Sequence, residues 1–218
     1  MLRFMNYLTE RRAEEKERRR AEILDAAETV AAEAGIDAMT MDQVARKARL
    51  SRALLYVYFE DKADLLFGLC NRALDILQQR FLDAVARNRE GIAQVEACGR
   101  AYVAFAQEFP VYAESLAEFE AHSLAQIAPD GNVGACVIAG DRVHAVLIEA
   151  IERGMQDGSV RKDAGPPALV SFTLWGLLHG VIQLASNKAA VLAHDGLSTG
   201  QLLDQALLMS VRSIATRR

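Results

Sequence analysis

The chain has 218 residues, of which 51% are hydrophobic and 25% charged, so it can bury a sizeable core and is not a disordered tail. A formal net charge of −4 excludes a uniformly basic protein that coats nucleic acid. The three cysteines are far apart and no apolar run precedes Glu10, so we expect reduced thiols, no metal site and a cytoplasmic protein without a cleavable signal.

The first expected elements are an N-terminal arm over residues 1–13 and an amphipathic helix over residues 14–34, ended by Gly35. Arginines in this region alternate with glutamates. They could reach an adjacent minor groove of DNA, or they could pair with the glutamates along a solvated helix. The second interpretation is favoured, and whether the arm contacts DNA stays open.

The next segment predicts two short helices joined by a tight turn. Thr40 and Gln43 form a capping-box pattern that starts a helix over residues 41–48, and Ser51 is the N-cap expected to start another over residues 52–58. Such a pair of helices holds its second helix in a groove of DNA. This pattern is the strongest functional signal in the chain.

Basic and tyrosine side chains gather on this helix pair. Residues 1–62 hold twelve Lys or Arg and twelve Asp or Glu, so a DNA-binding face must be a local patch. Arg52 is the best candidate for reading guanine, because its planar fork can bond to both acceptors on the major-groove edge. The residues expected to contact DNA are Thr40, Arg46, Lys47, Arg49, Ser51, Arg52, Ala53, Tyr56, Tyr58 and Lys62. The basic residues alone would also fit a solvated surface, but the paired caps and tyrosines favour DNA binding.

This segment resembles the DNA-binding domain of the tetracycline-repressor (TetR) family over about residues 20–66. The matching positions are Gly35, Thr40, Val44, Ala45, Ala48, Ser51, Leu55, Tyr56, Tyr58, Phe59, Lys62 and Leu65. The resemblance implies phosphate contacts by Thr40 and Lys62, and a recognition helix that carries Arg52, Ala53, Tyr56 and Tyr58. Arg49 departs from the family pattern by replacing a common glycine, Leu54 a small polar residue and Val57 an aromatic one, which leaves the operator sequence open.

Everything beyond Lys62 predicts helix, so the expected fold class is all-α, with a DNA-binding domain over residues 1–62 and a regulatory and dimerisation domain over residues 63–218. The expected helices cover residues 62–88, 92–109, 111–123, 133–156, 167–186 and 200–215, with a loop over residues 124–132. The first of these joins the two domains. The segment 164–187 has no charge, yet its prolines and polar side chains disfavour a membrane helix, and a helix buried on several sides is expected.

The last two expected helices carry more apolar surface than one small body normally hides. A homodimer would bury this surface, and it would place two recognition helices one DNA turn apart, about 34 Å, to read a palindromic operator. The residues assigned to the dimer interface are Phe172, Leu203, Leu207, Val211 and Ile214.

An apolar cavity is expected between the joining helix and the dimer helices. The candidates for its wall are Tyr102, Phe105, Phe109, Phe119, Trp175 and His179, with the histidine as a polar handle. Equally, Trp175 and His179 could pack in the core or in the subunit interface. No cofactor is expected, and the effector would be a small lipophilic molecule of unknown identity.

The function expected from these features is that of a dimeric repressor that a ligand releases from its operator. One alternative is a helix-turn-helix protein that is controlled by a protein partner or acts architecturally. The other is an all-helical enzyme, but the sequence shows no Ser-His-acid set, metal cluster or phosphate-binding loop, so an enzyme is not expected.

Overall fold

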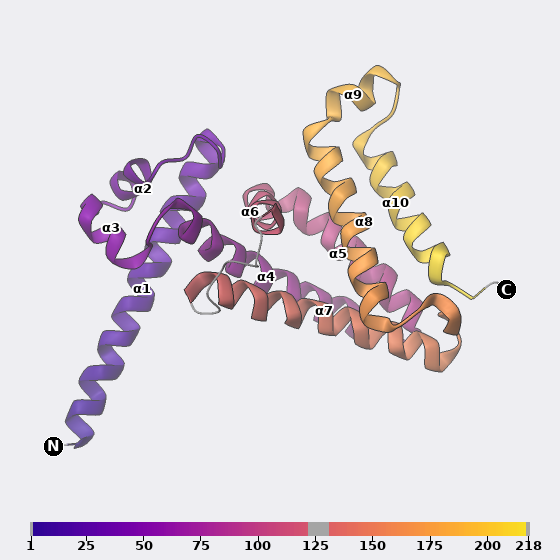
Figure 1. The fold of residues 1–218 in the computed structure, drawn as a ribbon, viewed down its shortest axis with the longest axis horizontal. Helices are drawn as coiled ribbons and strands as arrows, with labels where there is room; N and C mark the ends of the chain where they lie inside the picture. The colour runs from indigo at the N-terminus through magenta and orange to yellow at the C-terminus, as the bar shows by residue number, and fades with distance from the viewer. Residues whose placement is uncertain (1, 122–130, 217–218) are drawn as a thin grey trace.

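The computed structural model describes residues 2–121 and 131–216, and helices dominate it. The helices are α1 (Leu2–Ala34), α2 (Met41–Lys47), α3 (Arg52–Tyr58), α4 (Lys62–Ala86), α5 (Gly91–Glu108), α6 (Pro110–Ala121), α7 (Gly131–Asp157), α8 (Pro167–Asn187), α9 (Ala189–His194) and α10 (Thr199–Ile214), with a 3-10 turn η2 at Lys162–Ala164 (Figure 1). The predicted all-α fold class is confirmed.

The six helices predicted after α3 are all present, and each begins and ends within two residues of its predicted bounds, except that the predicted end of the helix 111–123 lies outside the described residues. The short helix α9 was not predicted, because the segment after α8 has neither an N-cap side chain nor enough length for a clear helical period. The predicted loop 124–132 lies outside the described residues as far as residue 130. Its last two positions, Gly131 and Asn132, belong to α7.

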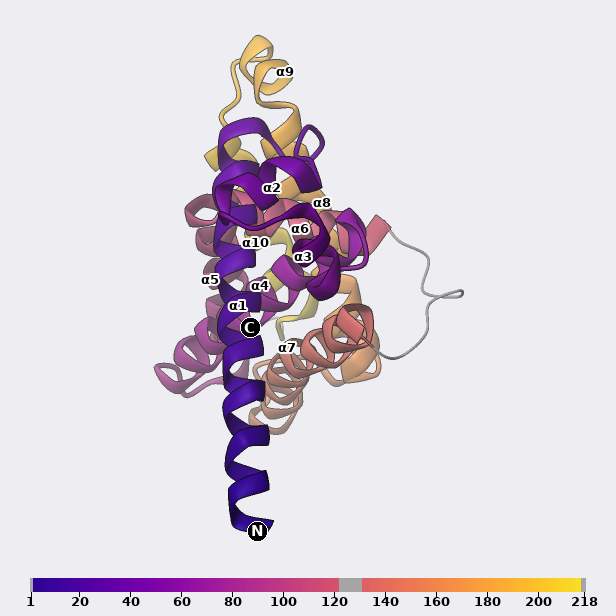
Figure 2. The same ribbon diagram turned by 90° about the vertical axis from the view of Figure 1, so that its left-hand side faces the viewer.

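The three N-terminal helices form one unit around a shared core. Val44 of α2 and Leu55 of α3 are fully buried in the core that these helices share with α1, and Gly35 ends α1 with a backbone φ of +84° that glycine adopts readily. Figure 2 views the chain from this end, where α1, α2 and α3 lie nearest the viewer and the N-terminal part of α1 extends beyond the rest of the chain.

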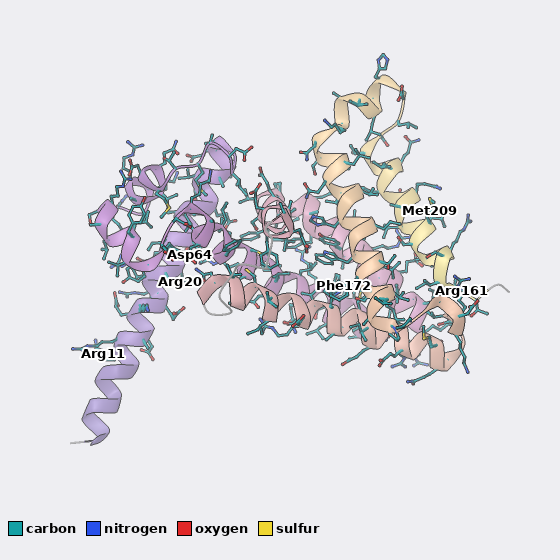
Figure 3. All side chains as sticks on the ribbon, in the orientation of Figure 1. Arg11, Arg20, Asp64, Arg161, Phe172 and Met209 are labelled. Carbon is teal, nitrogen blue, oxygen red and sulfur yellow. The ribbon has the colours of Figure 1, made fainter. Side chains whose placement is uncertain are left out.

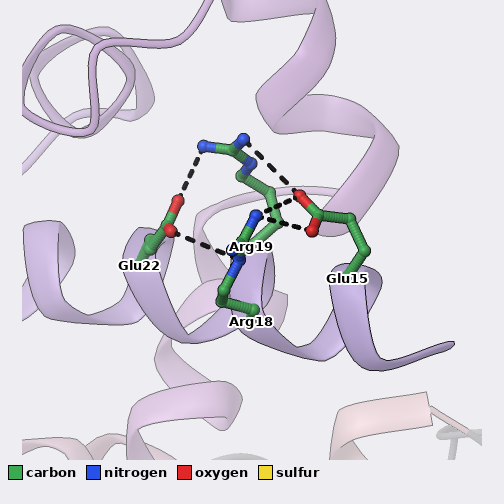
Figure 4. Close-up of polar contacts among 4 residues, drawn as sticks. All are labelled: Glu15, Arg18, Arg19 and Glu22. Carbon is green, nitrogen blue, oxygen red and sulfur yellow. Dashed lines mark hydrogen bonds and ion pairs between the residues drawn. The ribbon is translucent and has the colours of Figure 1, made fainter. Parts of the chain in front are cut away.

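The prediction of a separate arm over residues 1–13 was wrong. From Leu2 onward this segment is helical and continuous with α1, because no glycine or proline interrupts it. Further along α1, Arg18 pairs with Glu15 at 2.5 Å and Arg19 with Glu22 at 2.6 Å (Figure 4). These pairs bear out the interpretation that arginines and glutamates neutralise one another along a solvated helix.

The helices α4 and α7 pack along each other and connect the N-terminal unit to the far end of the chain, where α8 and α10 pair (Figure 1). The α5 helix packs between α4 and α7, and its first residue Gly91 lies so close to Gly154 of α7 that a Cβ would collide with the backbone. The helix α4 is separated from α3 by three residues, so it connects the N-terminal unit directly to the rest of the chain.

One side of α8 packs inside the chain, and the other side is exposed. Val170 and Leu178 are buried, whereas Leu169 and Phe172 are 64% and 57% exposed. By length and composition alone α8 could cross a membrane, but 39% of its apolar window is buried in the chain. Within the single chain one face of α8 is covered, so burial of this helix on several sides stays a prediction that requires a partner on the exposed face.

Candidate nucleic-acid interface and regulatory core

Side-chain caps fix the two helices of the N-terminal motif as the sequence predicted. The Gln43 amide donates to Thr40 Oγ1 at 3.3 Å and the Thr40 amide donates to Gln43 Oε1 at 2.8 Å, while the Leu54 amide donates to Ser51 Oγ at 3.2 Å. Arg49 in the turn between them has a φ of 57°, in the left-handed region that explains why glycine is common at this position. The turn therefore has a basic side chain on a residue whose backbone conformation a glycine would adopt without strain.

The orientation of α3 follows from two buried residues on its inner side. Leu55 and Phe59 are buried in the core of the unit, so Arg52, Ala53 and Tyr56, which are among the residues expected to contact DNA, face outward. Two further side chains share the outward surface of α3, and the site prediction left them out. They are Leu54, 38% exposed, and Val57, 72% exposed. The sequence had shown both as departures from a family pattern, which was the signal that could have identified them.

The guanidinium of Arg52 is held by two neighbours. Its Nε lies 3.3 Å from Asp42 Oδ1 on α2, and its Nη2 donates to Tyr56 Oη at 3.5 Å. The guanidinium carbon also lies 5.6 Å from the centre of the Tyr56 ring. Arg52 therefore stands on the exposed face with its direction set, and a contact to a base would have to replace the contact with Asp42.

Two of the other basic candidates have polar partners within the chain, and two have no ion-pair partner among the described residues. Lys47 pairs with Glu33 at 2.7 Å, and Lys62 donates to the Asp37 carbonyl at 2.8 Å, which ties the start of α4 to the loop after α1. Within residues 2–121 and 131–216, Arg46 and Arg49 are exposed and have no ion-pair partner. These two can meet phosphate without breaking a contact, whereas the two lysines would exchange one.

Three of the predicted DNA-contact residues also make contacts within the chain, namely Thr40, Ser51 and Tyr58. The first two are caps, and Tyr58 is half-buried with its carbonyl 3.4 Å from Nη1 of Arg20. The structure therefore brings nine of the ten predicted DNA-contact residues onto α2, α3 and the caps and turn beside them, while Lys62 is the first residue of α4.

A buried polar joint connects the N-terminal unit to the body of the chain. Arg20 of α1 donates through Nη2 to Asn132 Oδ1, and Asn132 Nδ2 donates to Asp64 Oδ1 of α4 at 2.6 Å. Asn71 Nδ2 of α4 donates to the Asn132 carbonyl at 3.0 Å. Figure 3 marks Arg20 and Asp64 side by side where α1, α4 and the start of α7 meet. A displacement of α7 would therefore move α1 and α4, the two helices that hold the N-terminal unit.

Three of the six predicted cavity residues meet in the body of the chain. Tyr102 of α5 stacks on Trp175 of α8 with ring centres 4.6 Å apart, and its hydroxyl lies 2.7 Å from Nδ1 of His179. Trp175 Nε1 donates to Glu120 Oε1 of α6 at 3.1 Å. Burial lowers the pKa of His179 and raises the pKa of Tyr102, so both are neutral near pH 7 and the hydroxyl can donate to the ring nitrogen.

The remaining aromatic candidates lie in two other clusters. Phe105 packs on Phe109 with ring centres 5.7 Å apart, and Phe119 contacts Phe67 edge-on at 5.9 Å. Beside Tyr102 and Trp175 an apolar cavity of about 40 Å³ lies among α4, α5, α7, α8 and α10. A drug-sized ligand needs roughly 300–1,000 Å³. This cavity is therefore too small for such a ligand, which would have to separate the helices that line it.

The dimer residues predicted on α10 need correction. Leu203, Leu207 and Ile214 are buried in the chain's own core and have little surface left for a partner, while Val211 lines the small cavity. The exposed apolar residues at this end include Leu169 and Phe172 of α8 and Leu208 and Met209 of α10. Phe172 stacks on His144 with ring centres 4.1 Å apart, and Figure 3 marks both Phe172 and Met209.

The three cysteines are free and buried. Burial raises the pKa of Cys98 to about 12, and a hydrogen bond with the Cys136 thiol raises that of Cys70, so the thiols of Cys98 and Cys70 stay protonated near neutral pH. In the part of the chain that the structure describes, no group of three His, Cys, Asp or Glu side chains is placed to hold a metal ion.

A capped two-helix motif supported by α1 and joined to an all-helical body is the architecture of a helix-turn-helix transcriptional regulator. The chain belongs to the TetR family. The model for bacterial regulatory proteins of the tetR family matches residues 23–69, and the model for the tetracyclin repressor-like C-terminal domain matches residues 95–209.

One relative is the HTH-type transcriptional regulator HbdR from Aromatoleum sp. (strain CIB), with 38% identity over 76 residues, which cover 35% of this chain and 31% of that regulator. The matched region thus spans about a third of the relative. FadR from Bacillus subtilis, solved with stearoyl-CoA, has a similar fold with a TM-score of 0.68 at 16% identity, over 89% of this chain and 98% of the other. AibR, solved with isovaleryl coenzyme A and operator DNA, gives 0.63 at 20% identity, over 88% and 97%.

Proposed function

We propose that this TetR-family regulator is a dimeric repressor that binds a palindromic operator through α3 and leaves it when a small lipophilic ligand binds. The observation that carries the proposal is the orientation of α3. Its inner side is locked by Leu55 and Phe59, so the outer side presents Arg52 and Tyr56 to solvent. A helix held in this way can enter a major groove and place a fork-shaped donor against guanine.

In this proposal the basic residues around α3 divide the work. Arg52 reads a base edge, while Arg46, Lys47, Arg49 and Lys62 neutralise phosphates and give affinity without sequence preference. Thr40 and Ser51 contact phosphate from the two helix starts, and Ala53, Tyr56 and Tyr58 complete the surface. We place the boundary between the DNA-binding domain and the regulatory domain at Lys62, where α4 begins. Such a regulator acts where bacterial DNA lies, in the cytoplasm.

The exposed apolar faces of α8 and α10 support dimerisation. Leu169 and Phe172 on α8 and Leu208 and Met209 on α10 are large apolar side chains at one end of the chain. Exposed apolar surface of this kind commonly marks a subunit interface. A two-fold interface there would hold two copies of α3 for the two halves of a palindrome.

The proposed effector enters the core beside Tyr102 and Trp175. Because the cavity there is about 40 Å³, a ligand would push apart α4, α5, α7, α8 and α10, and α4 would pass the displacement to the recognition unit. FadR and AibR, which share the fold, were solved with acyl-coenzyme A molecules, and this supports a lipophilic acyl ligand here. A coupling of about 1–3 kcal/mol would change operator affinity roughly 5- to 150-fold.

The near absence of free space in the core also favours a second candidate, a DNA-binding regulator controlled by a protein partner. Titration of stearoyl-CoA and isovaleryl-CoA into an operator complex separates the two. Release of DNA by either thioester supports ligand control. Unchanged operator affinity at saturating thioester, with binding to the protein shown by calorimetry, would contradict release by this class of ligand.

DNA binding is tested first on duplexes selected from a random pool with the full-length protein. The Arg52→Ala variant should lose roughly 5- to 150-fold of its affinity for the selected duplex and much less for random duplex, because base contacts are specific. Arg46→Ala is the matched control, since this exposed arginine has no ion pair to disturb within the described residues. It should weaken both duplexes by the same factor. If no duplex is enriched above the random pool, the proposed function is wrong.

A further inference from the structure

The outward surface of α3 is divided into a polar strip and an apolar strip. Arg52 and Tyr56 lie one helical turn apart and contact each other, and they form the polar strip. Ala53, Leu54 and Val57 lie beside them at helical spacing and form the apolar strip. Within this strip the amide of Leu54 donates to the Ser51 cap, and all three side chains are exposed.

Packing within the chain leaves much of the apolar surface of Leu54 and Val57 exposed. Val57 is 72% exposed and Leu54 38% exposed, while the buried side chains of Leu55 and Phe59 hold this helix on the core. Valine is also a weak helix former, and α3 has seven residues, so an exposed valine contributes nothing to its stability. Single exposed apolar residues are ordinary on protein surfaces. These two adjoin Arg52, on the face that the proposed function turns toward base pairs.

We propose that Leu54 and Val57 read thymine methyl groups in the operator half-site. The inference rests on the proposed DNA binding by α3 and adds a base class to it. In the major groove the thymine C5-methyl is the apolar group that base edges offer, whereas guanine, adenine and cytosine present donors and acceptors that an apolar side chain would desolvate without replacing. An apolar strip therefore favours thymine and disfavours the other bases.

The spacing between Leu54 and Val57 also implies that the two thymines lie in adjacent base pairs. Leu54 and Val57 are three residues apart, which is about 4.5 Å along a helix axis. Successive base pairs are about 3.4 Å apart along one strand. Two side chains at this separation can meet adjacent base pairs, next to the guanine assigned to Arg52. The half-site should therefore hold consecutive A·T pairs beside a G·C pair.

The test uses the operator selected from a random pool, with each thymine replaced in turn by deoxyuridine, which removes the methyl group and keeps the base pair. Deoxyuridine at a contacted position should weaken binding of the unaltered protein about fourfold, the value of one buried methyl-sized group. In Val57→Ala or Leu54→Ala the same substitution should change affinity less than about twofold, because the methyl group has lost its partner.

Leu82→Ala is the matched control, because Leu82 is an exposed leucine on α4 that lies in a groove with α7 and away from α3. It should keep the full deoxyuridine effect. Thermal unfolding of Val57→Ala should match that of the unaltered protein, since the side chain is exposed and alanine favours helix.

Deoxyuridine effects of equal size in the unaltered protein and both α3 variants would overturn the inference. A second result would also overturn it: Val57→Ala loses affinity, yet every thymine can be replaced by deoxyuridine at no cost. In that case Val57 contacts the sugar-phosphate backbone and not a base. Both results require a selected operator that Arg52→Ala weakens, so they are distinct from a failure to bind DNA at all.

Discussion

Arg52 begins α3 with its guanidinium between the Asp42 carboxylate and the Tyr56 hydroxyl. These contacts hold the fork toward the solvent before DNA arrives, but Asp42 also places a negative charge on the face that would approach phosphates. Contacts between exposed ions are weak and screened by salt, so exchange for a base edge is feasible at little cost. Asp42 should therefore restrain binding to DNA of any sequence more than it restrains binding to the operator.

Replacing Asp42 by asparagine should raise affinity for random-sequence duplex roughly two- to fivefold at low salt, because a repulsive surface charge is removed. The gain should shrink at higher salt, and the ratio of operator to random affinity should fall. Fluorescence anisotropy at two salt concentrations measures both. Asp75→Asn removes the same charge from a surface pair with Arg142, remote from α3, and serves as the control. Equal gains for the two variants would refute the local role of Asp42.

The sequence predicted the caps of α2 and α3 and, to within one residue, the bounds of these helices, because short-range side-chain signals determine where a helix begins and ends. It did not predict the partners of the basic residues. Glu33 for Lys47 and the Asp37 carbonyl for Lys62 come from the way α1 and its following loop pack on the motif. Long-range pairs of this kind depend on tertiary packing, and spacing along one helix carries no information about them.

Among the helices, the contact of α5 with α8 shows the same limit. Trp175 and His179 lie one turn apart on α8, so the sequence could place them on one face. That Tyr102 from α5 would stack on the indole and reach the imidazole could not be read from spacing, because it depends on how two distant helices cross. The result is a neutral hydrogen-bonded pair, Tyr102 with His179, in a half-buried place.

This pair makes the stability of the α5–α8 contact depend on pH. Burial holds the pKa of His179 below its usual value, and that of His144 on α7 is lowered in the same way. In the unfolded chain these imidazoles titrate near pH 6.5, so below that pH the unfolded state binds more protons. The stabilisation is complete above about pH 7 and is lost as the pH falls through 6.5 toward the folded-state pKa values.

Thermal unfolding at pH 7.5 and 5.5 should give a lower Tm at the acidic pH, and His179→Gln should reduce this difference because an imidazole with a lowered pKa is gone. His194→Gln, at the exposed end of α9, is the control and should keep the full difference. A pH dependence that is identical in both variants would assign the effect to groups outside the α5–α8 contact.

At the scale of the whole chain, the N-terminal unit of α1, α2 and α3 and the α8–α10 pair lie at opposite ends (Figure 1). The helices α4 and α7 connect these ends, and the hydrogen bonds of Asn132 join the N-terminal unit to α4 and α7. The sequence predicted the helices of this arrangement but assigned the wrong side of α10 to a partner. Apolar residues wrap most of α10, and periodicity cannot tell which stripe the chain covers itself. The packing of α5 and α8 against Leu203 and Leu207 decides it and leaves Met209 exposed.

If the exposed faces of α8 and α10 join two copies, a charge at Phe172 should break the dimer. Phe172→Glu would bury an unpaired carboxylate in the interface, at a cost of about 3–5 kcal/mol, so the dimer dissociation constant should rise at least roughly 100-fold. Sedimentation velocity should then show monomer. Affinity for a palindromic duplex should fall toward that for a single half-site, because the second α3 is no longer held in register.

Leu82→Glu puts the same charge on an exposed apolar position of α4, outside the α8–α10 face, and should leave the sedimentation of the protein unchanged. Far-ultraviolet circular dichroism of Phe172→Glu should remain helical, since Phe172 is 57% exposed in the single chain and its removal opens little core. A helical variant that still sediments as a dimer would place the subunit interface elsewhere. The two copies of α3 would then face DNA with a spacing that α8 does not control, and operator symmetry would have to come from another contact.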